Sequence, residues 1–492
     1  MSKRYRDSHS SADQILLLPP SLHDWLPDGH AAYFVLDVVE QLDLSAIERP
    51  IQAKDPRGER PYSPAMMVAL LFYAYMNGVF SSRRIARRCL EDVAFRVISG
   101  NHQPAYSTIN AFRRTHLEAL SAMFVQVLRL CEAAGLVQAP HVHQDGTKIQ
   151  ASASKHKAMS YDRMKKEEAR LKAEINELLD KAEEADAEED ARLGKDKDGS
   201  EGVVDEIKRR ESRRDWIRKA KAALEAEAKK ARASKLRENA QGLRERADIE
   251  ENAAEAKRKR TRADRSEAQA DDLDPELEPE PDAPPDRLPK HRVKTEPDGT
   301  PKPKAQRNFT DPDSRIMKDG RGAFMQSYNG QIAVDEDSRV IVASELSNQA
   351  PDQEYLEPVL AKTTANLGRT PETWTGDAGY FSEANVDVCE QAGCTPYLAP
   401  GRQRRQWPPP DTVEGAPPDD LDSKERMRWQ LRTREGRERM RRRKFTVEPD
   451  FGIIKEAMGF KRFLLRGMDK VRAEWNLVCI AYNLRTLHSA QR

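Results

Sequence analysis

The sequence predicts an α/β core, in which helices flank a mixed sheet, together with an all-α N-terminal domain and a charged helical insertion. Three observations predict this arrangement. Apolar residues recur at helical spacing through residues 13–138, β-rich segments occur at 139–158 and again within 311–492, and charged residues of both signs dominate 159–270. A chain of 492 residues is too long for one compact core, so two or three domains are expected.

Residues 1–138 are expected to form an N-terminal domain built of helices. The run "SPAMMVALLFYAYMNG" opens with Ser63 as a candidate N-cap and Pro64 at the first helical position. Ser107 is a candidate cap for a later helix, "STINAFRR", which follows two shorter helices and a turn. This order resembles a helix-turn-helix, whose last helix reads DNA. In this interpretation the residues that contact base edges are Thr108, Asn110 and Arg113. The alternative is an ordinary helical bundle with a basic exterior.

The segment 159–270 has the composition of long, exposed helices. Between residues 161 and 260, 28 Lys or Arg stand against 27 Asp or Glu, a balance that favours salt-bridged helices. Gly194, Gly199 and Gly202 interrupt the stretch, so two helices that return on each other are expected. Nine prolines between 275 and 303 predict that residues 271–310 form a disordered linker.

The remaining segments predict the sheet of the core. Residues 139–158 hold its first strand, and "GAFMQSYNGQIAVDEDSRVIVASELS" in 311–492 predicts a hairpin. A helix ended by Gly368, a short strand in "ETWTGDAGY", a helix capped by Ser382, a strand in "TPYLAP" and a long helical region from about 446 to 488 follow. Without the insertion, the predicted order of elements is strand, strand, strand, helix, strand, helix, strand, helix. This is the layout of ribonuclease H-like folds.

Two carboxylates lie at strand ends of this predicted core, and a third lies in a helix. Asp145 is on the first strand, Asp377 follows the fourth, and Glu448 comes just after Thr446, a candidate helix cap. The edge of an α/β sheet where strands end is where such folds place their chemistry. An isolated Asp-Gly is more often only a turn, and Glu448 could merely stabilise the first turn of its helix. Glu448 and Lys455 are seven residues apart, so they would share a helix face.

Histidines and arginines near these carboxylates allow further interpretations. His141 and His143 alternate with Asp145, so all three would face one side of the strand. A histidine metal site is the weaker alternative to strand residues or DNA contacts. Residues 424–444 contain 11 Lys or Arg against 3 Glu, which predicts a phosphate-binding surface. Its alternative is a solvated helix face.

Composition limits where such a protein would act. Net charge is +1, so any nucleic-acid surface must come from local clustering. The five cysteines are scattered and form no CxxC pair, which favours a reducing compartment. The start "MSKRYRDSHS" has no signal-peptide core, and the apolar run 65–76 is too short to span a bilayer. We expect a cytoplasmic protein without a membrane partner.

Three segments resemble the catalytic blocks of DDE transposases from bacterial insertion sequences: "HQDGTKIQASASKHKAMSY", "TGDAGYFSEANV" and "RRRKFTVEPDFGIIKEAMGFKRFLLRG". The resemblance is to the branch whose last block reads Tyr, Arg, Glu, Lys, and "YSPAMMVALLFYAYMNGVFSSRRIARRC" resembles its N-terminal domain. It implies an acidic triad of Asp145, Asp377 and Glu448. The lysine of the family would be Lys455 and its arginine Arg443, with Lys444 the less favoured match. Met440 stands at the tyrosine position, and a thioether cannot donate a hydrogen bond.

The resemblance also implies a reaction and its partners. Three carboxylates would hold two Mg²⁺ ions on the order of 4 Å apart, and Mn²⁺ can substitute. The expected activity is hydrolysis of phosphodiesters at the ends of an insertion sequence and strand transfer into double-stranded target DNA. A homodimer or higher homo-oligomer on DNA is expected. Arg441, Arg442, Arg443 and Lys444 would contact phosphates. Because of Met440, a catalytically weakened relative that only binds DNA is the alternative.

Overall fold

The computed structural model describes residues 21–53, 60–193, 201–274, 288–319, 322–401, 411–418 and 420–491. These residues form two compact units. One comprises Met1–Val137, Ala457–Gly459 and Asn476–Arg492, and the other comprises Gln138–Glu456 and Phe460–Trp475. We call them the N-terminal unit and the sheet unit. No helix in the described part of the chain is both long enough and apolar enough to cross a membrane.

The N-terminal unit is helical, as the sequence predicts. Its elements are η1 (Leu22–Trp25), α1 (Ala31–Glu40), α2 (Ser45–Gln52), α3 (Pro64–Met76), α4 (Ser82–Glu91), α5 (Val93–Ile98), α6 (Tyr106–Thr115) and α7 (Leu117–Ala133). Helix α3 is buried along nearly its whole length and begins with Pro64 after Ser63, as expected. Helix α6 begins earlier than expected: Ala105 is its N-cap, and Ser107 lies inside it.

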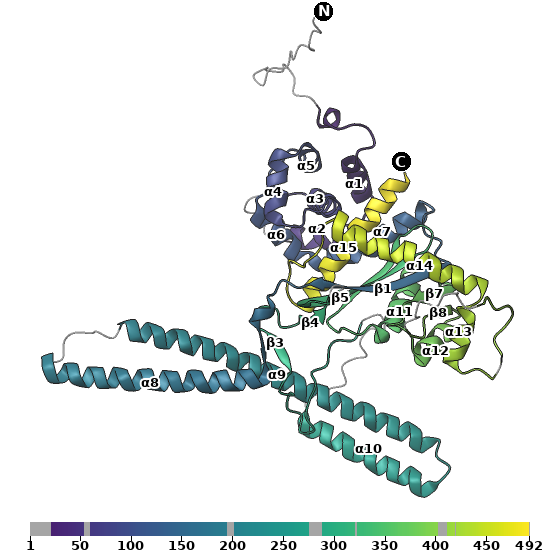
Figure 1. Ribbon diagram of the computed structural model, residues 1–492. Coiled ribbons are helices and arrows are strands. Elements are labelled where there is room, and N and C mark those ends of the chain that lie inside the picture. Colours follow the sequence, from purple (N-terminus) through teal and green to yellow (C-terminus); the bar gives the residue numbers. More distant parts are fainter. Residues whose placement is uncertain are drawn as a thin grey trace, which may run out of the picture. The chain divides into compact units, whose positions relative to one another are not determined.

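The sheet unit contains a mixed sheet with the strand order β4-β5-β1-β7-β8, in which β6 also pairs with β5 (Figure 1). The strands are β1 (His141–Gln150), β4 (Arg315–Lys318), β5 (Phe324–Asp335), β6 (Ile341–Ser347), β7 (Thr373–Gly376) and β8 (Thr395–Leu398). Strand β1 runs antiparallel to β5 and parallel to β7. Strands β5 and β6 form the predicted antiparallel hairpin. The sheet therefore has an antiparallel half and a parallel half, which meet at β1.

Local signals in the sequence place the helices between the parallel strands. Helix α11 (Leu356–Leu367), preceded by η3 (Gln353–Tyr355), ends at Gly368, whose φ of 69° is left-handed and therefore favours glycine. Helix α12 (Glu383–Gln391) begins at Ser382, whose side chain accepts a hydrogen bond from the Asn385 N–H. Both ends agree with the prediction.

The C-terminal helices differ from the prediction. They are α13 (Ser423–Gln430), α14 (Arg434–Gly452), a π-helical turn (Ile453–Ala457) and α15 (Met468–Ala490). Thr446 is not a cap: α14 starts after Thr433, whose side chain accepts from the Gly436 N–H, and Thr446 bonds to the Arg442 carbonyl within the helix. Pro449 lies inside α14, just before the π-helical turn.

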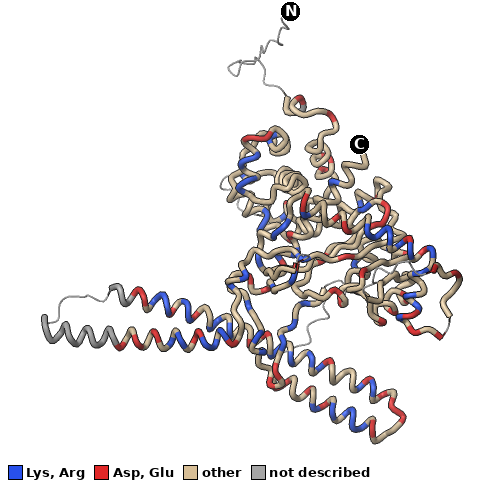
Figure 2. The backbone as a smooth tube through the Cα atoms, viewed as in Figure 1, with Lys and Arg blue, Asp and Glu red and all other residues tan. Residues whose placement is uncertain are grey.

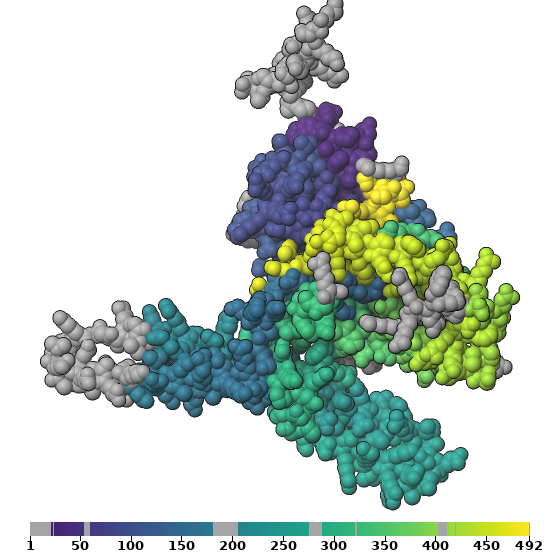
Figure 3. Space-filling view, viewed as in Figure 1, coloured from purple at the N-terminus to yellow at the C-terminus, as the bar shows by residue number. Residues whose placement is uncertain are grey.

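The charged insertion leaves the sheet after β1 and returns before β4. Its described residues form three helices rather than two: α8 (Tyr161–Leu193), α9 (Glu201–Asp248) and α10 (Ala253–Leu273). Helix α9 packs against α8 and against α10 (Figures 1 and 3). Gly202 lies within α9, whereas Gly194 and Gly199 lie outside the described residues.

Ion pairs and narrow apolar seams hold these helices together. Basic and acidic residues are intermixed along the described parts of all three helices (Figure 2). Cross-helix pairs such as Arg213–Glu167, at 2.9 Å, join α8 to α9, and Arg237–Asp271, at 2.8 Å, joins α9 to α10. Met164, Leu171 and Ile217 form one of the small apolar clusters. Because exposed ion pairs contribute little each, these seams supply much of the packing energy.

The expectation of a disordered linker over 271–310 is wrong for its described part. Residues 271–273 belong to α10, and β3 (Gln306–Asn308) pairs with β2 (Ala158–Ser160), which follows η2 (Lys155–Lys157). Val293 is buried against Tyr161 and Leu224, so apolar contacts fix the chain despite its prolines. Residues 275–287 lie outside the described residues.

Candidate active site

Asp145 lies on the central strand of the sheet and is mostly enclosed. Its side chain is 17% exposed, and its Oδ2 lies 3.3 Å from the Arg443 guanidinium of α14. Burial raises the pKa of Asp145 to about 6, and the charges of Asp377 and Asp352 add to this rise, while Arg443 opposes it. The carboxylate is therefore held in a position where its negative charge is only partly compensated.

Asp377 follows β7, the parallel neighbour of β1. Its Oδ1 accepts a hydrogen bond of 2.8 Å from the Gly379 N–H. A Cβ atom at position 379 would lie 3.0 Å from that same oxygen and 3.6 Å from the Cβ of Asp352. The glycine thus lets the turn after β7 pack closely against both aspartates. The sequence predicted Asp145 on the first strand and Asp377 after the fourth, and the structure has Asp145 within β1 and Asp377 directly after β7. The pairing of His143 with Thr375 shows that these two strands are neighbours.

Asp352 is a third aspartate beside these two, and sequence reasoning missed it. It precedes η3, and it accepts hydrogen bonds from Lys148 at 3.1 Å, Asn329 at 2.6 Å and Gln331 at 2.9 Å. Those donors come from β1 and β5, which are far from residue 352 in the sequence. The one available signal was an acidic residue in the loop that follows a predicted strand.

Glu448 is the exposed member of the predicted triad. It lies on α14, whose buried side presents Arg443, Thr446, Val447 and Asp450. Among the described residues, no group of three or more His, Cys, Asp or Glu side chains is arranged to hold a metal ion. The structure thus has Asp145 on β1 and Asp377 directly after the neighbouring β7, with Glu448 in no group of three acidic side chains arranged for a metal. Convergence of all three carboxylates stays a prediction.

Lys455 lies close to β1, the strand that contains Asp145. Its Nζ donates to the Thr147 hydroxyl and to the Lys148 carbonyl at 3.4 Å. Burial lowers the pKa of Lys455, while Asp145 raises it. The expectation that Lys455 shares a face with Glu448 assumed a continuous α-helix, and the π-helical turn Ile453–Ala457 interrupts that helix.

One histidine of β1, His141, joins the strand to α14, whereas His143 pairs with Glu336, the residue after β5. His141 lies 3.0 Å from the Thr373 hydroxyl and 2.7 Å from Arg439, and the Nε2 of buried His143 lies 3.2 Å from Glu336. Arg439 and Arg443 are one helical turn apart, so His141 and Asp145 face the same helix, as the alternation predicted. The weaker alternative, a histidine metal site, receives no support from these contacts in the described residues.

Much of the positive charge in the segment 424–444 is paired within the protein. Glu336 lies 2.7 Å from Arg439 and 3.0 Å from Arg442, and Glu438 lies 3.0 Å from both Arg441 and Arg442. Lys444 is exposed, and Met440 is half-buried. The charge available to phosphates is therefore smaller than the count of arginines indicates.

A second basic surface lies beside the end of β1, and sequence reasoning missed it. A cavity of about 620 Å³ is lined by Lys155, Lys157, Arg462 and Arg466 together with half-exposed Phe324. Arg466 donates to the Ser152 carbonyl at 2.9 Å, which fixes it against the chain that leaves β1. The cluster "SKHK" directly after the first strand was the signal for it.

The predicted DNA-reading residues of α6 separate into two groups. Thr108 and Asn110 are exposed. Arg113 is only 4% exposed and donates to the Tyr75 hydroxyl at 3.1 Å and to the Phe80 carbonyl at 2.9 Å. The prediction that Arg113 contacts bases is therefore wrong, because its guanidinium is used to hold the helices together.

The mixed sheet, with Asp145 within β1 and Asp377 at the end of the neighbouring β7, defines a class: α/β proteins that assemble an acidic site where a strand of the sheet ends. Comparison with protein families makes the assignment specific. The model of the family described as Transposase DDE domain matches residues 282–484, and that of Transposase domain (DUF772) matches residues 20–115. No curated protein and no solved structure matches the chain. The chain belongs to the DDE transposases of insertion sequences.

This membership carries several general properties. The DDE domain has a ribonuclease H-like fold, and the mixed sheet with its helices agrees with that. The family acts on DNA and generally uses a divalent metal ion. Asp145 and Asp377 fit such an ion, because Mg²⁺ is usually bound by one or two carboxylates plus phosphate oxygens. The raised pKa of Asp145 is also what a nearby cation would lower.

Proposed function

We propose that this transposase hydrolyses phosphodiesters at the ends of its insertion sequence and transfers the freed strands into target DNA. The observation that carries the proposal is that Asp145, within β1, and Asp377, directly after the neighbouring β7, each come two residues beyond the paired His143 and Thr375. Lys455 beside β1 supplies a cation for the phosphate of the bound strand. The basic surface around Arg462 and Arg466 supports a path for DNA past the same strand.

In this proposal Asp145, Asp377 and Glu448 hold Mg²⁺ ions, for which Mn²⁺ can substitute. Bound there, the ions would activate a water or 3′ hydroxyl for attack and stabilise the charge on the leaving oxygen. Arg443 offsets part of the negative charge on Asp145 and keeps its carboxylate in place. Lys455, whose Nζ donates to the hydroxyl of Thr147 two residues beyond Asp145 on β1, orients a phosphate beside that carboxylate.

The other parts of the chain bind DNA in this proposal. The domain 1–138 reads element ends through Thr108 and Asn110 on α6. The segment 424–444 contacts phosphates through Lys444 and through those of its arginines that DNA can draw from their acidic partners. The active form is a homodimer or higher homo-oligomer on DNA, which the mass of the DNA complex tests.

Cleavage of DNA from the ends of the encoding element tests the chemistry. Asp145→Asn and Asp377→Asn should each abolish Mg²⁺-dependent cleavage and leave duplex binding intact. The matched control is Asp387→Asn on the exposed face of α12, which makes the same change away from β1 and should cleave normally. Cleavage by either active-site variant at the rate of the control would exclude the proposal.

The alternative, a weakened transposase that mainly binds DNA, is favoured by Met440. A methionine cannot donate the hydrogen bond that a tyrosine would. If the alternative holds, the wild-type protein binds element ends without cutting them, and Met440→Tyr increases cleavage. Equal cleavage by the wild type and Met440→Tyr would show that the thioether costs no activity.

A further inference from the structure

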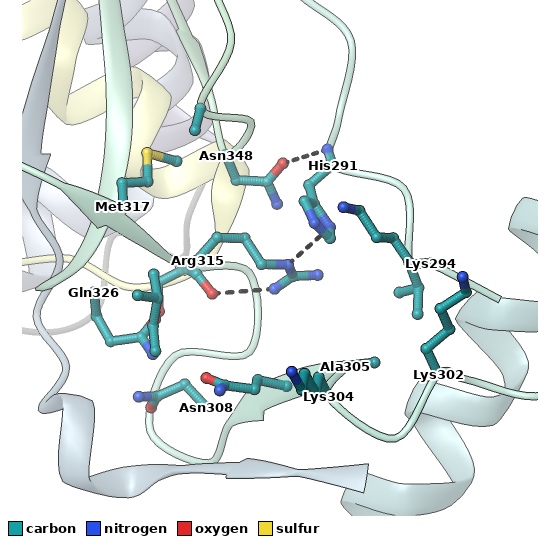
Figure 4. Close-up of a pocket in the computed structure, with 15 residues that line it drawn as sticks. His291, Lys294, Lys302, Lys304, Ala305, Asn308, Arg315, Met317, Gln326 and Asn348 are labelled. Carbon is teal, nitrogen blue, oxygen red and sulfur yellow. Dashed lines mark hydrogen bonds between the residues drawn. The ribbon is translucent and has the colours of Figure 1, made fainter. Parts of the chain in front are cut away.

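A second cavity lies in the sheet unit at the β4 edge (Figure 4). Its volume is about 530 Å³, within the range of sites for small ligands. The chain that returns from the insertion, residues 291–308, forms one wall, and β4 with Gln326 of β5 forms the other. Strand β5 separates β4 from β1 in the sheet, so this cavity is distinct from the acidic site.

The described residues that line this cavity carry positive charge without any acidic residue. Lys294, Lys302 and Lys304 lie at its rim, Arg315 lies in its wall, and none of the lining residues is Asp or Glu. Within the described part of the chain, none of the three lysines forms an ion pair, although many basic residues of the neighbouring insertion do. Glu227, 3.5 Å away, partly offsets the charge of Arg315, but it does not offset the three rim lysines. Ammonium groups without acidic partners around one concave site attract an anion.

The inner wall of the cavity offers hydrogen-bond donors. Arg315 donates to the Nδ1 of His291 at 3.3 Å and to the Ser314 carbonyl at 3.1 Å, and Figure 4 shows Lys294 on the same side as His291. Because Nδ1 of His291 accepts, its proton lies on Nε2, which can donate to a ligand. Burial and the charge of Arg315 lower the pKa of His291 to about 4, so this histidine is neutral at pH 7 and accepts from Arg315 throughout the physiological range.

We propose that this cavity binds a phosphate group, carried either by a DNA strand or by a free nucleotide. A phosphate offers several acceptor oxygens and one or two negative charges, which suits three ammonium groups better than a single carboxylate does. The cavity is also large enough for an attached sugar or base, and Val293 and Met317 give it apolar walls. The site lies beyond the proposed cleavage chemistry. Because its walls come from the returning insertion chain and from β4, a bound phosphate would tie the two together.

The test compares a variant that lacks two lysines at the rim of the cavity with a control variant that lacks two lysines elsewhere. Lys302→Ala with Lys304→Ala is the test variant. Lys208→Ala with Lys257→Ala is the control, since both lysines are exposed on insertion helices and form no ion pair with described residues. All variants are made in the Asp145→Asn protein, so that cleavage does not interfere. The probes are inorganic phosphate, dAMP and a random duplex.

The expected result is that the test variant alone loses phosphate-dependent binding. For duplex DNA, the slope of log affinity against log salt should fall by roughly 1.8, because each lost phosphate contact contributes about 0.9. For a free nucleotide, calorimetric binding of dAMP or phosphate should be lost in the test variant and kept in the control.

The two readouts identify the source of the phosphate. A change in the duplex slope assigns the cavity to DNA, and loss of dAMP binding with an unchanged slope assigns it to a free nucleotide. If the test variant matches the control for all three probes, the proposal is overturned. None of these measurements uses cleavage, so failure of the cavity and failure of the proposed chemistry are separate outcomes.

Discussion

Replacing Asp145 with asparagine should stabilise the protein at neutral pH in the absence of divalent metal. The pKa of Asp145 is about 6 in the folded protein, against 3.8 for a free aspartate, and burial is the main cause. A difference of about two units corresponds to about 3 kcal/mol by which folding disfavours the charged carboxylate. Asparagine has nearly the same shape and no charge, so the variant should recover most of this free energy. The pairing with Arg443 is already included, since it lowers the same pKa.

The sign of this effect fixes its dependence on pH. A carboxylate whose pKa is raised by folding destabilises the protein fully above pH 6 and not at all below about pH 3.8. The advantage of Asp145→Asn should therefore be largest at pH 7.5 and should shrink as the pH falls from 6 toward 4. Added Mg²⁺ should stabilise the wild type and not the variant, because ligand binding to the folded state adds to stability.

Urea unfolding in a chelating buffer measures the effect. Trp374 and Trp475 are fully buried in the sheet unit, so their fluorescence reports its unfolding. With an m-value of about 3 kcal/mol/M, the midpoint should rise by up to about 1 M for Asp145→Asn at pH 7.5. Asp387→Asn on exposed α12 should change stability by less than about 0.5 kcal/mol. If Asp145→Asn is no more stable than the wild type, then burial of the charged Asp145 carboxylate does not destabilise the folded protein, and the reasoning is refuted.

Three further variants test other contacts of the site. Arg443→Ala should raise the pKa of Asp145 above 6, so titrations of Mg²⁺-dependent stability should show their midpoint at higher pH than in the wild type; an unmoved midpoint would mean that the 3.3 Å pair is not formed. Glu336→Gln should cost about 3–5 kcal/mol at pH 7, because it leaves buried basic groups unpaired. Although burial alone would raise it, His143 and Arg439 lower the pKa of Glu336 to about 2; its contribution should be full above pH 4.5 and lost as the pH falls toward 2, in acid unfolding curves. Alanine at both Arg441 and Arg442 should lower the salt slope of duplex binding by clearly less than 1.8, because their acidic partners already compete with phosphates; a full drop of 1.8 would contradict this.

The elements that the sequence predicts well are those with their own local signals. The β5–β6 hairpin, the end of α11 at Gly368 and the cap of α12 at Ser382 each depend on residues adjacent in the chain. The start of α14 was mispredicted because Thr446 and Pro449 imitate a helix start. Contacts of Arg439 and Arg443 with β1 and its flanking residues hold α14 in place, and such contacts between distant segments cannot be seen in a local pattern.

The candidate site shows the same difference between residues with a local sequence signal and residues positioned by contacts between distant segments. Asp145 could be placed on β1 and Asp377 after β7, because each lies in or beside a segment with its own strand signal, and strand ends in an α/β order are where chemistry is placed. Asp352 could not, because its place beside them depends on hydrogen bonds from Lys148 and Asn329 on two other strands. Arg113 was misassigned for the complementary reason: a basic residue in a predicted recognition helix has the same sequence signature whether its side chain is exposed or buried.

Glu448 provides a last prediction, which follows from the charges already at the strand ends. The negative charges of Asp377 and Asp352 raise the pKa of Asp145, so a further negative charge beside these aspartates is unfavourable. A third carboxylate brought to this place would raise that pKa again, unless a divalent cation offset the repulsion. We therefore expect Glu448→Gln to leave stability unchanged in chelating buffer and to reduce the stabilisation that saturating Mg²⁺ gives the wild type. Asp387→Asn should keep the full Mg²⁺ effect. If Glu448→Gln retains the whole Mg²⁺-dependent stabilisation, then Glu448 stays exposed on α14 and does not bind the metal. The third ligand must then be another group.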